Sequence, residues 1–175
     1  MCKSLIVAML LAGVGGLWGC GYHLVGTSSF LPEDLKLLYL DKFSNLTSWP
    51  DVDQRLDEAL AREWVRRRRF ELLERRDRAQ LAIEGVVQSI TMVPVALDDH
   101  GRATEYQMTL TVSARLVDIR GEEPIVLWED KAFSRRTSYD VDVSAVDYFD
   151  RQVQAMEVVS QDLARALVTA VLEGF

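Results

Sequence analysis

The chain has 175 residues, of which 49% are hydrophobic and 27% are charged, and its formal net charge at pH 7 is −7. This length suits a single domain with an adequate hydrophobic core. Because the chain is acidic, it is a poor candidate for a nucleic-acid-binding protein.

Residues 1–19 have the layout of a bacterial signal peptide. Lys3 supplies a positive start, and an apolar run from Leu5 to Ala12 follows it. That run is too short for a membrane-spanning helix, which needs ~20 residues. We therefore expect residues 1–19 to be removed after export.

Cys20 comes next, and Leu17-x-Gly19-Cys20 resembles the lipobox of bacterial lipoproteins. The resemblance implies that Cys20 carries covalent lipid, with palmitate-type acyl chains, and becomes the first residue of the mature chain. Several acyl chains bury enough CH₂ groups for stable anchoring. An Asp directly after the lipidated cysteine would favour retention in the inner membrane. Because Gly21 stands at that position, we expect the outer membrane. The alternative is an ordinary cleaved signal followed by a chance cysteine.

Residues 20–175 are then predicted to form one domain, with residues 20–34 as a tether. The short apolar run at 35–40 indicates a buried strand. Turn and cap residues between 44 and 50 lead into a helical pattern from about 50 to 69. The apolar side chains of this pattern share one helix face: Val52, Leu56, Ala59, Leu60 and Trp64.

A second strand region covers residues 70–73 and 81–94, with a charged turn at 74–79 between them. Gly85 lies inside this region, where a glycine indicates either a bulge or a point of close packing.

The strand pattern is clearest in residues 106–116, where apolar and polar side chains alternate. This period of two predicts one apolar and one polar sheet face. A further strand at 125–139 and a long amphipathic helix from about 149 to 171 follow.

The predicted element order is β-α-β-β-β-α. A strand–helix–strand unit favours a parallel pair, whereas the short turns that join the later strands predict antiparallel pairs. Because both helices have an apolar stripe and the sheet has one strongly apolar face, we predict an α+β fold. It is a two-layer sandwich, a mixed sheet of about four strands with both helices on one face.

This order also predicts what lies at each end of the sheet. The end away from the N-terminus should carry the segments 42–49, 96–103 and 140–147. The opposite end should carry the turns at 74–79 and 119–123.

Three segments carry a family resemblance. They are Cys20-Gly21-Tyr22-His23-Leu24, the block from Gly101 to Met108 with Glu105-Tyr106 inside it, and the block from Phe133 to Tyr139. Together with the element order, they resemble the lipopolysaccharide-assembly lipoproteins of the LptE family. The resemblance implies an outer-membrane lipoprotein that plugs the LptD-type β-barrel, assists its assembly and helps deliver lipopolysaccharide to the outer leaflet.

Gln107, Thr109, Thr111 and Ser113 form the polar row of the alternating strand, and the resemblance makes them candidates for facing the barrel. A polar row fits a barrel lumen, which is polar. The alternative is an ordinary solvated sheet face, which antiparallel sheets commonly have.

Arg102, Arg135 and Arg136 are the candidate contacts for lipopolysaccharide or another phosphate. The run Arg66–Arg69 is either a phosphate contact or a solvated helix end that the helix dipole favours. The acids Asp98, Asp99, Asp140, Asp142 and Asp147 outnumber the cations expected at the far end, which argues against lipopolysaccharide binding at that tip.

Two other functions remain open. A stand-alone lipid carrier or scaffold lipoprotein would need an apolar cavity between sheet and helices. A periplasmic enzyme would need converging ionisable groups, and the sequence offers only His23 and His100, with no nucleophile motif. We expect no catalysis, no metal and no cofactor beyond the lipid on Cys20.

Overall fold

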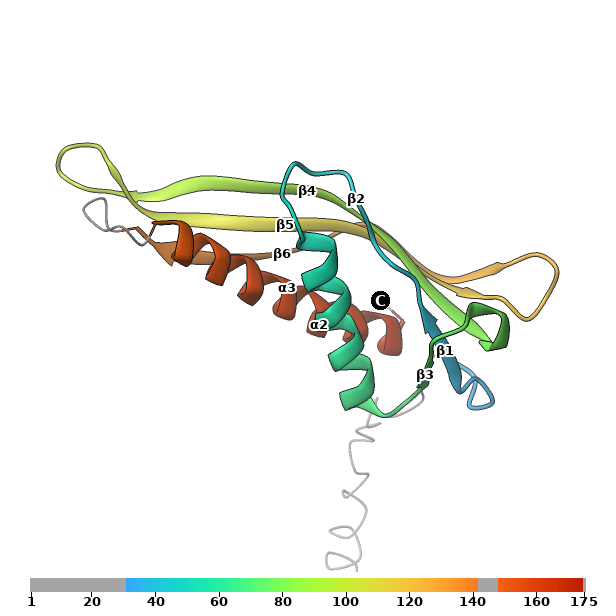
Figure 1. Cartoon of the computed structure of the whole chain (residues 1–175). Helices are drawn as coiled ribbons and strands as arrows, with labels where there is room; N and C mark the ends of the chain where they lie inside the picture. Colours follow the sequence, from blue (N-terminus) through green and yellow to red (C-terminus); the bar gives the residue numbers. More distant parts are fainter. Residues whose placement is uncertain (1–30, 142–147, 175) are drawn as a thin grey trace, which may run out of the picture.

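The computed structural model describes residues 31–141 and 148–174 (Figure 1). The elements, labelled as in Figure 1, are β1 (Leu37–Leu40), β2 (Ser44–Asn45), α2 (Val52–Arg67), β3 (Glu71–Leu73), the 3₁₀ turn η1 (Arg76–Arg78), β4 (Leu81–Leu97), β5 (Ala103–Asp118), β6 (Ile125–Asp140) and α3 (Tyr148–Glu173). The signal peptide, Cys20, and the acids Asp142 and Asp147 lie outside the described residues.

The six strands form one mixed sheet, in the order β3-β1-β4-β5-β6, with β2 paired to β4. β1 runs parallel to both β3 and β4, as the strand–helix–strand unit predicts. β4, β5 and β6 are joined in antiparallel pairs. Both helices lie on one side of this sheet (Figure 1), so the predicted α+β class is confirmed.

The predicted strand count and strand order are wrong. The region expected to be one second strand is two strands, because η1 separates β3 from β4 and the two pair with opposite edges of β1. The two-residue β2 lies in the segment predicted as turns. Strands this short have too few residues to show a period of two, so their pairing depends on neighbours that are distant in the sequence.

The core lies between the sheet and the helices. The predicted apolar face of α2 is confirmed, since Val52, Leu56, Leu60 and Trp64 are fully buried. Large buried side chains from the long strands and α3 complete the same cluster: Leu81, Ile83, Met108, Leu110, Leu116, Phe133, Leu163 and Leu167.

A bulge in β4 keeps its apolar side chains on the helix side. Before the bulge, Ile83 and Val87 point inward, and the register with β5 then shifts between Val87 and Ser89. Beyond it, Ile90 and Met92 pack against the core. A bulge of one residue reverses which positions of a strand face inward.

Gly85 is a point of close packing rather than the bulge itself. It stands opposite Ala114 in β5, and the two small residues leave room for the buried ring of Phe43. A Cβ at Gly85 would overlap that ring.

The connections between strands lie only partly at the ends of the sheet where the sequence predicted them. The β4–β5 turn lies at one end and the β5–β6 turn at the other (Figure 1). The segment 42–49 does not reach the far end, because β2 pairs with Val86 and Val87, midway along β4. At the far end, Val141 N donates a hydrogen bond to Thr104 O at 2.7 Å, so β6 ends beside the β4–β5 hairpin.

The entry of the chain into the domain is fixed at the C-terminal end of α2. Leu31 and Leu35 are buried in the core. The Arg69 guanidinium donates to Leu35 O and Pro32 O, both at 2.8 Å. Part of the predicted tether is therefore packed on the domain.

Candidate functional site

The sheet side that faces away from the helices carries a band of hydroxyl and amide side chains, here named the polar face. Its members come from the three long strands: Ser89, Thr91, Gln107, Thr109, Thr111, Ser113, Ser134, Arg136 and Ser138. Gln107, Thr109, Thr111 and Ser113 are half-buried because they belong to the central strand β5. Arg136 is the one charged member of this set.

The register shows how these side chains form rows across the sheet. Thr109 lies between Thr91 and Arg136, and Thr111 lies between Ser89 and Ser134. Strands are spaced by ~4.8 Å, so each row presents neighbouring polar groups that can exchange hydrogen bonds with a partner surface. The polar row expected from the sequence therefore shares one face with similar residues from both neighbouring strands.

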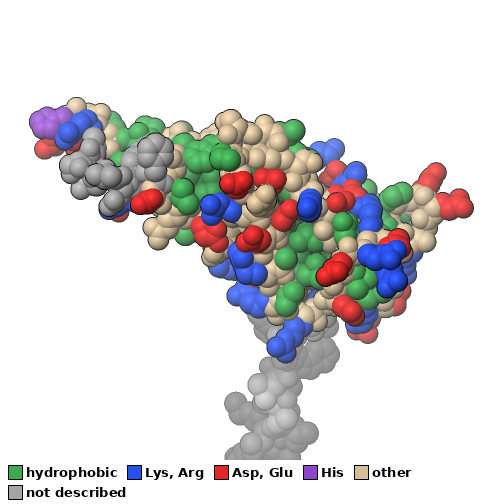
Figure 2. Space-filling model, in the orientation of Figure 1, with side chains coloured by type: hydrophobic (Ala, Val, Ile, Leu, Met, Phe, Trp, Pro, Cys, Tyr) green, Lys and Arg blue, Asp and Glu red, His purple; other side chains and the backbone are tan. Residues whose placement is uncertain are grey.

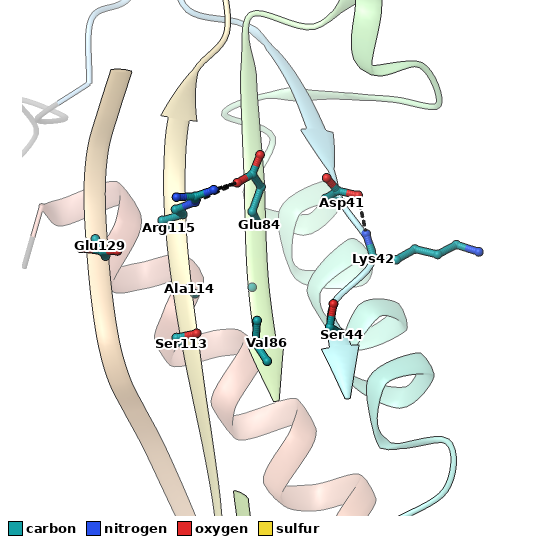
Figure 3. Close-up of a pocket in the computed structure, with 10 residues that line it drawn as sticks. Asp41, Lys42, Ser44, Glu84, Val86, Ser113, Ala114, Arg115 and Glu129 are labelled. Atoms are coloured by element: carbon teal, nitrogen blue, oxygen red, sulfur yellow. Dashed lines mark hydrogen bonds and ion pairs between the residues drawn. The ribbon is translucent and has the colours of Figure 1, made fainter. Parts of the chain in front are cut away.

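A hollow of about 450 Å³ adjoins this face at Ser113 (Figure 3). Glu84 lies in it and joins two arginines, with Oε1 accepting from Arg76 Nη2 at 2.5 Å and Oε2 accepting from Arg115 Nη2 at 2.6 Å. Arg76 also reaches Asp41 at 2.8 Å. This ion-pair network joins η1, β4 and β5 to Asp41, the residue that follows β1.

The pKa of Glu84 is set by two opposing effects. Burial raises the pKa, but the hydrogen bonds from Arg76 and Arg115 outweigh burial, so the pKa lies below its usual value of 4.5. A depressed carboxylate pKa stabilises the fold above the unfolded-state value, and this stability is lost as pH falls through the folded-state value.

The three predicted phosphate contacts are not brought together. Arg102 lies in the β4–β5 turn, where its Nη2 and Nε are 2.7 and 2.8 Å from Asp98 Oδ2. The side chain of Arg136 belongs to the polar face. Its neighbour Arg135 pairs with Leu110 of β5 and lies on the helix side of the sheet. Adjacent residues of a strand point to opposite sides of the sheet. Which of these two arginines faces the helices depends on the bulge between Asp130 and Phe133, because the bulge shifts the alternation along β6.

Asp98 also organises the tip of this turn. Its Oδ1 accepts from the backbone N–H groups of Arg102 at 2.9 Å and His100 at 2.8 Å. The backbone hydrogen bond from Arg102 is the largest effect on Asp98 and lowers its pKa. The Arg102 charge is thus balanced within its own turn, and Asp99 and Asp140 add negative charge to this end.

The run Arg66–Arg69 is divided among three environments. Arg66 and Arg67 both pair with the buried Glu63, at 2.5 and 2.8 Å. Burial raises the pKa of Glu63, but the two arginines outweigh it and lower the pKa. Arg69 binds the carbonyls at the chain entry, and Arg68 is exposed. Most of this run therefore stabilises the end of α2.

Within residues 31–141 and 148–174, no group of three or more His, Cys, Asp or Glu side chains is placed to hold a metal ion. No helix in the described part of the chain is long and apolar enough to cross a membrane.

The model of the LptE family, described as lipopolysaccharide-assembly, matches residues 35–171. The chain belongs to this family. The match spans the sheet, both helices and the polar face, which confirms the family that the sequence resembles.

Solved structures with a similar fold include a hypothetical protein, CT253, from Chlamydia trachomatis. It is 12% identical, the match covers 81% of this chain and 97% of that one, and the TM-score is 0.57. A minor lipoprotein from Acinetobacter baumannii is 21% identical over 82% of this chain and 95% of its own, with a TM-score of 0.45. Lipoprotein B from Nitrosomonas europaea is 20% identical over 89% and 97%, with a TM-score of 0.47. At these identities the first similarity shows the fold alone, and no curated protein sequence matches the chain.

Proposed function

We propose that this LptE-family protein is an outer-membrane lipoprotein, anchored by lipid on Cys20, that forms a complex with the LptD-type β-barrel. In this role it plugs the barrel, assists its assembly and helps deliver lipopolysaccharide to the outer leaflet. It acts through binding surfaces rather than catalysis, and it needs no cofactor beyond its lipid.

The observation that carries the proposal is the polar face, taken together with the family match over residues 35–171. A barrel interior is polar, and a band of hydroxyl and amide side chains can exchange hydrogen bonds with such a surface. The helices lie on the other side of the sheet (Figure 1), so they leave this face uncovered.

The alternative, a stand-alone lipid carrier, fits the structure less well. Such a carrier needs an apolar cavity between the two layers. Here that space is filled by a continuous cluster of buried side chains, including Trp64, Met108 and Phe133.

Photo-crosslinking in cells tests the proposal. A photo-reactive residue at Thr109 places the probe in the middle of the polar face, and one at Gln161, exposed on α3, is the matched control. We expect the Thr109 probe to capture a large β-barrel protein and the Gln161 probe to capture far less of it.

Affinity purification from detergent-solubilised envelopes gives the second readout. Recovery of the lipoprotein with a large β-barrel at a constant ratio supports the proposal. Recovery without any such partner, combined with no crosslink from Thr109, would show it to be wrong.

A further inference from the structure

A groove on the helix side of the molecule, away from the polar face, is lined by arginines from three different elements. Its volume is about 530 Å³. It is lined by Arg67 of α2, Arg135 of β6, and Asp162, Arg165, Ala166, Thr169 and Ala170 of α3. We name it the arginine groove.

Arg135 has no carboxylate partner within ion-pair distance among the described residues. Its guanidinium carbon lies 4.7 Å from the centre of the Phe133 ring, and Nη1 donates to the backbone oxygen of Ser134 at 2.7 Å. Stacking on a ring holds a guanidinium in place while its edge stays free. Arg135 is thus held in position with donors to spare.

Arg67 and Arg165 are each held by one carboxylate and also keep free donors. Arg67 Nε donates to Glu63 Oε1 at 2.8 Å, and its Nη2 donates to Thr169 Oγ1 at 2.6 Å. Arg165 Nη1 donates to Asp162 Oδ1 at 3.0 Å. The Nη1 group of Arg67 and the Nη2 group of Arg165 have no acceptor among the described residues.

The charge in the groove is opposite in sign to the charge of the protein. Three guanidinium groups and one carboxylate, Asp162, line it, although the whole chain has a net charge of −7. Figure 2 shows Lys and Arg side chains along the lower side of the helical layer, with Asp and Glu among them. A local excess of positive charge of this kind attracts an anion.

We propose that the arginine groove binds the phosphate group of an anionic ligand. Guanidinium forks bind phosphate through paired hydrogen bonds, and three of them, from three different elements, line this groove. The groove is larger than a phosphate, and Ala166 and Ala170 provide an apolar wall for whatever group carries the phosphate. The groove lies on the opposite side of the sheet from the polar face, so the two proposed sites share no residues.

The probe for the test is inorganic phosphate. The full lipoprotein is reconstituted in phosphatidylcholine nanodiscs and titrated with phosphate, and binding is followed by ³¹P NMR. We expect saturable binding that Arg135→Gln weakens about tenfold, since each charge-assisted hydrogen bond contributes substantially to anion binding. Arg165→Gln should weaken it similarly, which guards against a folding defect in one variant.

Arg136→Gln is the matched control. It removes the same charge from the neighbouring residue of the same strand, on the opposite side of the sheet, and should leave phosphate binding unchanged. Circular dichroism melts of all three variants check that the fold is intact.

Nanodiscs that contain phosphatidic acid identify the source of the phosphate. If phosphatidic acid abolishes the binding of inorganic phosphate, the groove binds a lipid headgroup. If inorganic phosphate still binds, the ligand is a free phosphate compound. Absence of binding to the wild-type protein, or equal losses in Arg135→Gln and Arg136→Gln, would overturn the proposal.

Discussion

At the scale of single residues, Asp57 has an unusual environment for a carboxylate. It lies on α2 beneath the segment that joins β1 to β2, and its Oδ1 accepts a hydrogen bond from Phe43 N at 3.2 Å. Burial raises its pKa from 3.8 to about 6, although the Phe43 hydrogen bond acts in the other direction. The folded state therefore binds a proton at this site more tightly than the unfolded state does.

This raised pKa predicts a specific pH dependence of stability. Well below pH 3.8, the ordinary pKa of this group, Asp57 is protonated in both states and contributes no difference. As pH rises towards 6, the folded protein must either keep the proton or bury a charge, so wild-type stability falls relative to the variant Asp57→Asn. The difference should reach at most about 3 kcal/mol, because one pKa unit corresponds to ~1.36 kcal/mol.

Urea unfolding at pH 4, 5, 6 and 7 measures this difference. Asn retains a side-chain oxygen for the Phe43 N–H, so the variant changes charge more than geometry. Glu58→Gln is the control, because it removes a neighbouring carboxylate whose side chain is 71% exposed. A stability difference between wild type and Asp57→Asn that stays the same at every pH would contradict the assignment.

At the scale of elements, the packing of the β1–β2 segment over the long strands depends on two small residues. Phe43, 2% exposed, is placed over Gly85 of β4, with Ala114 opposite it in β5. Gly85→Ala should destabilise the protein by about 1–3 kcal/mol, the usual cost of overpacking a core. Urea denaturation midpoints measure the loss.

Gly121→Ala is the matched control for that substitution. Gly121 lies in the β5–β6 turn, and the nearest atom to an added Cβ is 3.5 Å away. Its midpoint should stay close to that of the wild type. If the two variants are equally stable, the overlap with the Phe43 ring is relieved at no cost, and the explanation of Gly85 is incorrect.

At the scale of the whole molecule, the sheet separates two surfaces of different chemistry. One carries the polar face, whose only charged member is Arg136, with the ion-pair network of Glu84 and Arg115 beside it. The other is the helical layer, where the arginine groove lies. The surface proposed to meet the barrel and the groove proposed to bind phosphate therefore share no residues.

The proposed lipid anchor belongs to this scale too, because it would attach the molecule to a membrane surface. Cys20→Ser should abolish lipidation, since the serine oxygen does not replace the cysteine sulfur as acceptor of the diacylglyceryl group. We expect the variant to leave the membrane fraction and to lack the added lipid mass in intact mass spectrometry. Cys2→Ser is the control, because this residue should depart with the signal peptide. A Cys20→Ser protein that still carries the lipid mass would contradict the prediction.

Local patterns in the sequence determined much of this protein. The alternation through residues 106–116 was enough to predict the inward and outward sides of β5, and the helical periodicity was enough to predict the buried face of α2. These patterns are local because a side chain's direction repeats with its own backbone. The family resemblance depends on such segments as well, and the match of the LptE family model to residues 35–171 confirms it.

The tertiary structure decided what depends on distant partners. Only strand pairing places β3 beside β1 and puts Arg135 and Arg136 on their respective sides of the sheet. The arginine groove combines residues of α2, β6 and α3 that are about 100 positions apart at its extremes, so no local pattern marks it. Hydrogen bonds between strands and contacts between layers are not encoded in the periodicity of any one segment, and for that reason the sequence predicted the elements better than their arrangement.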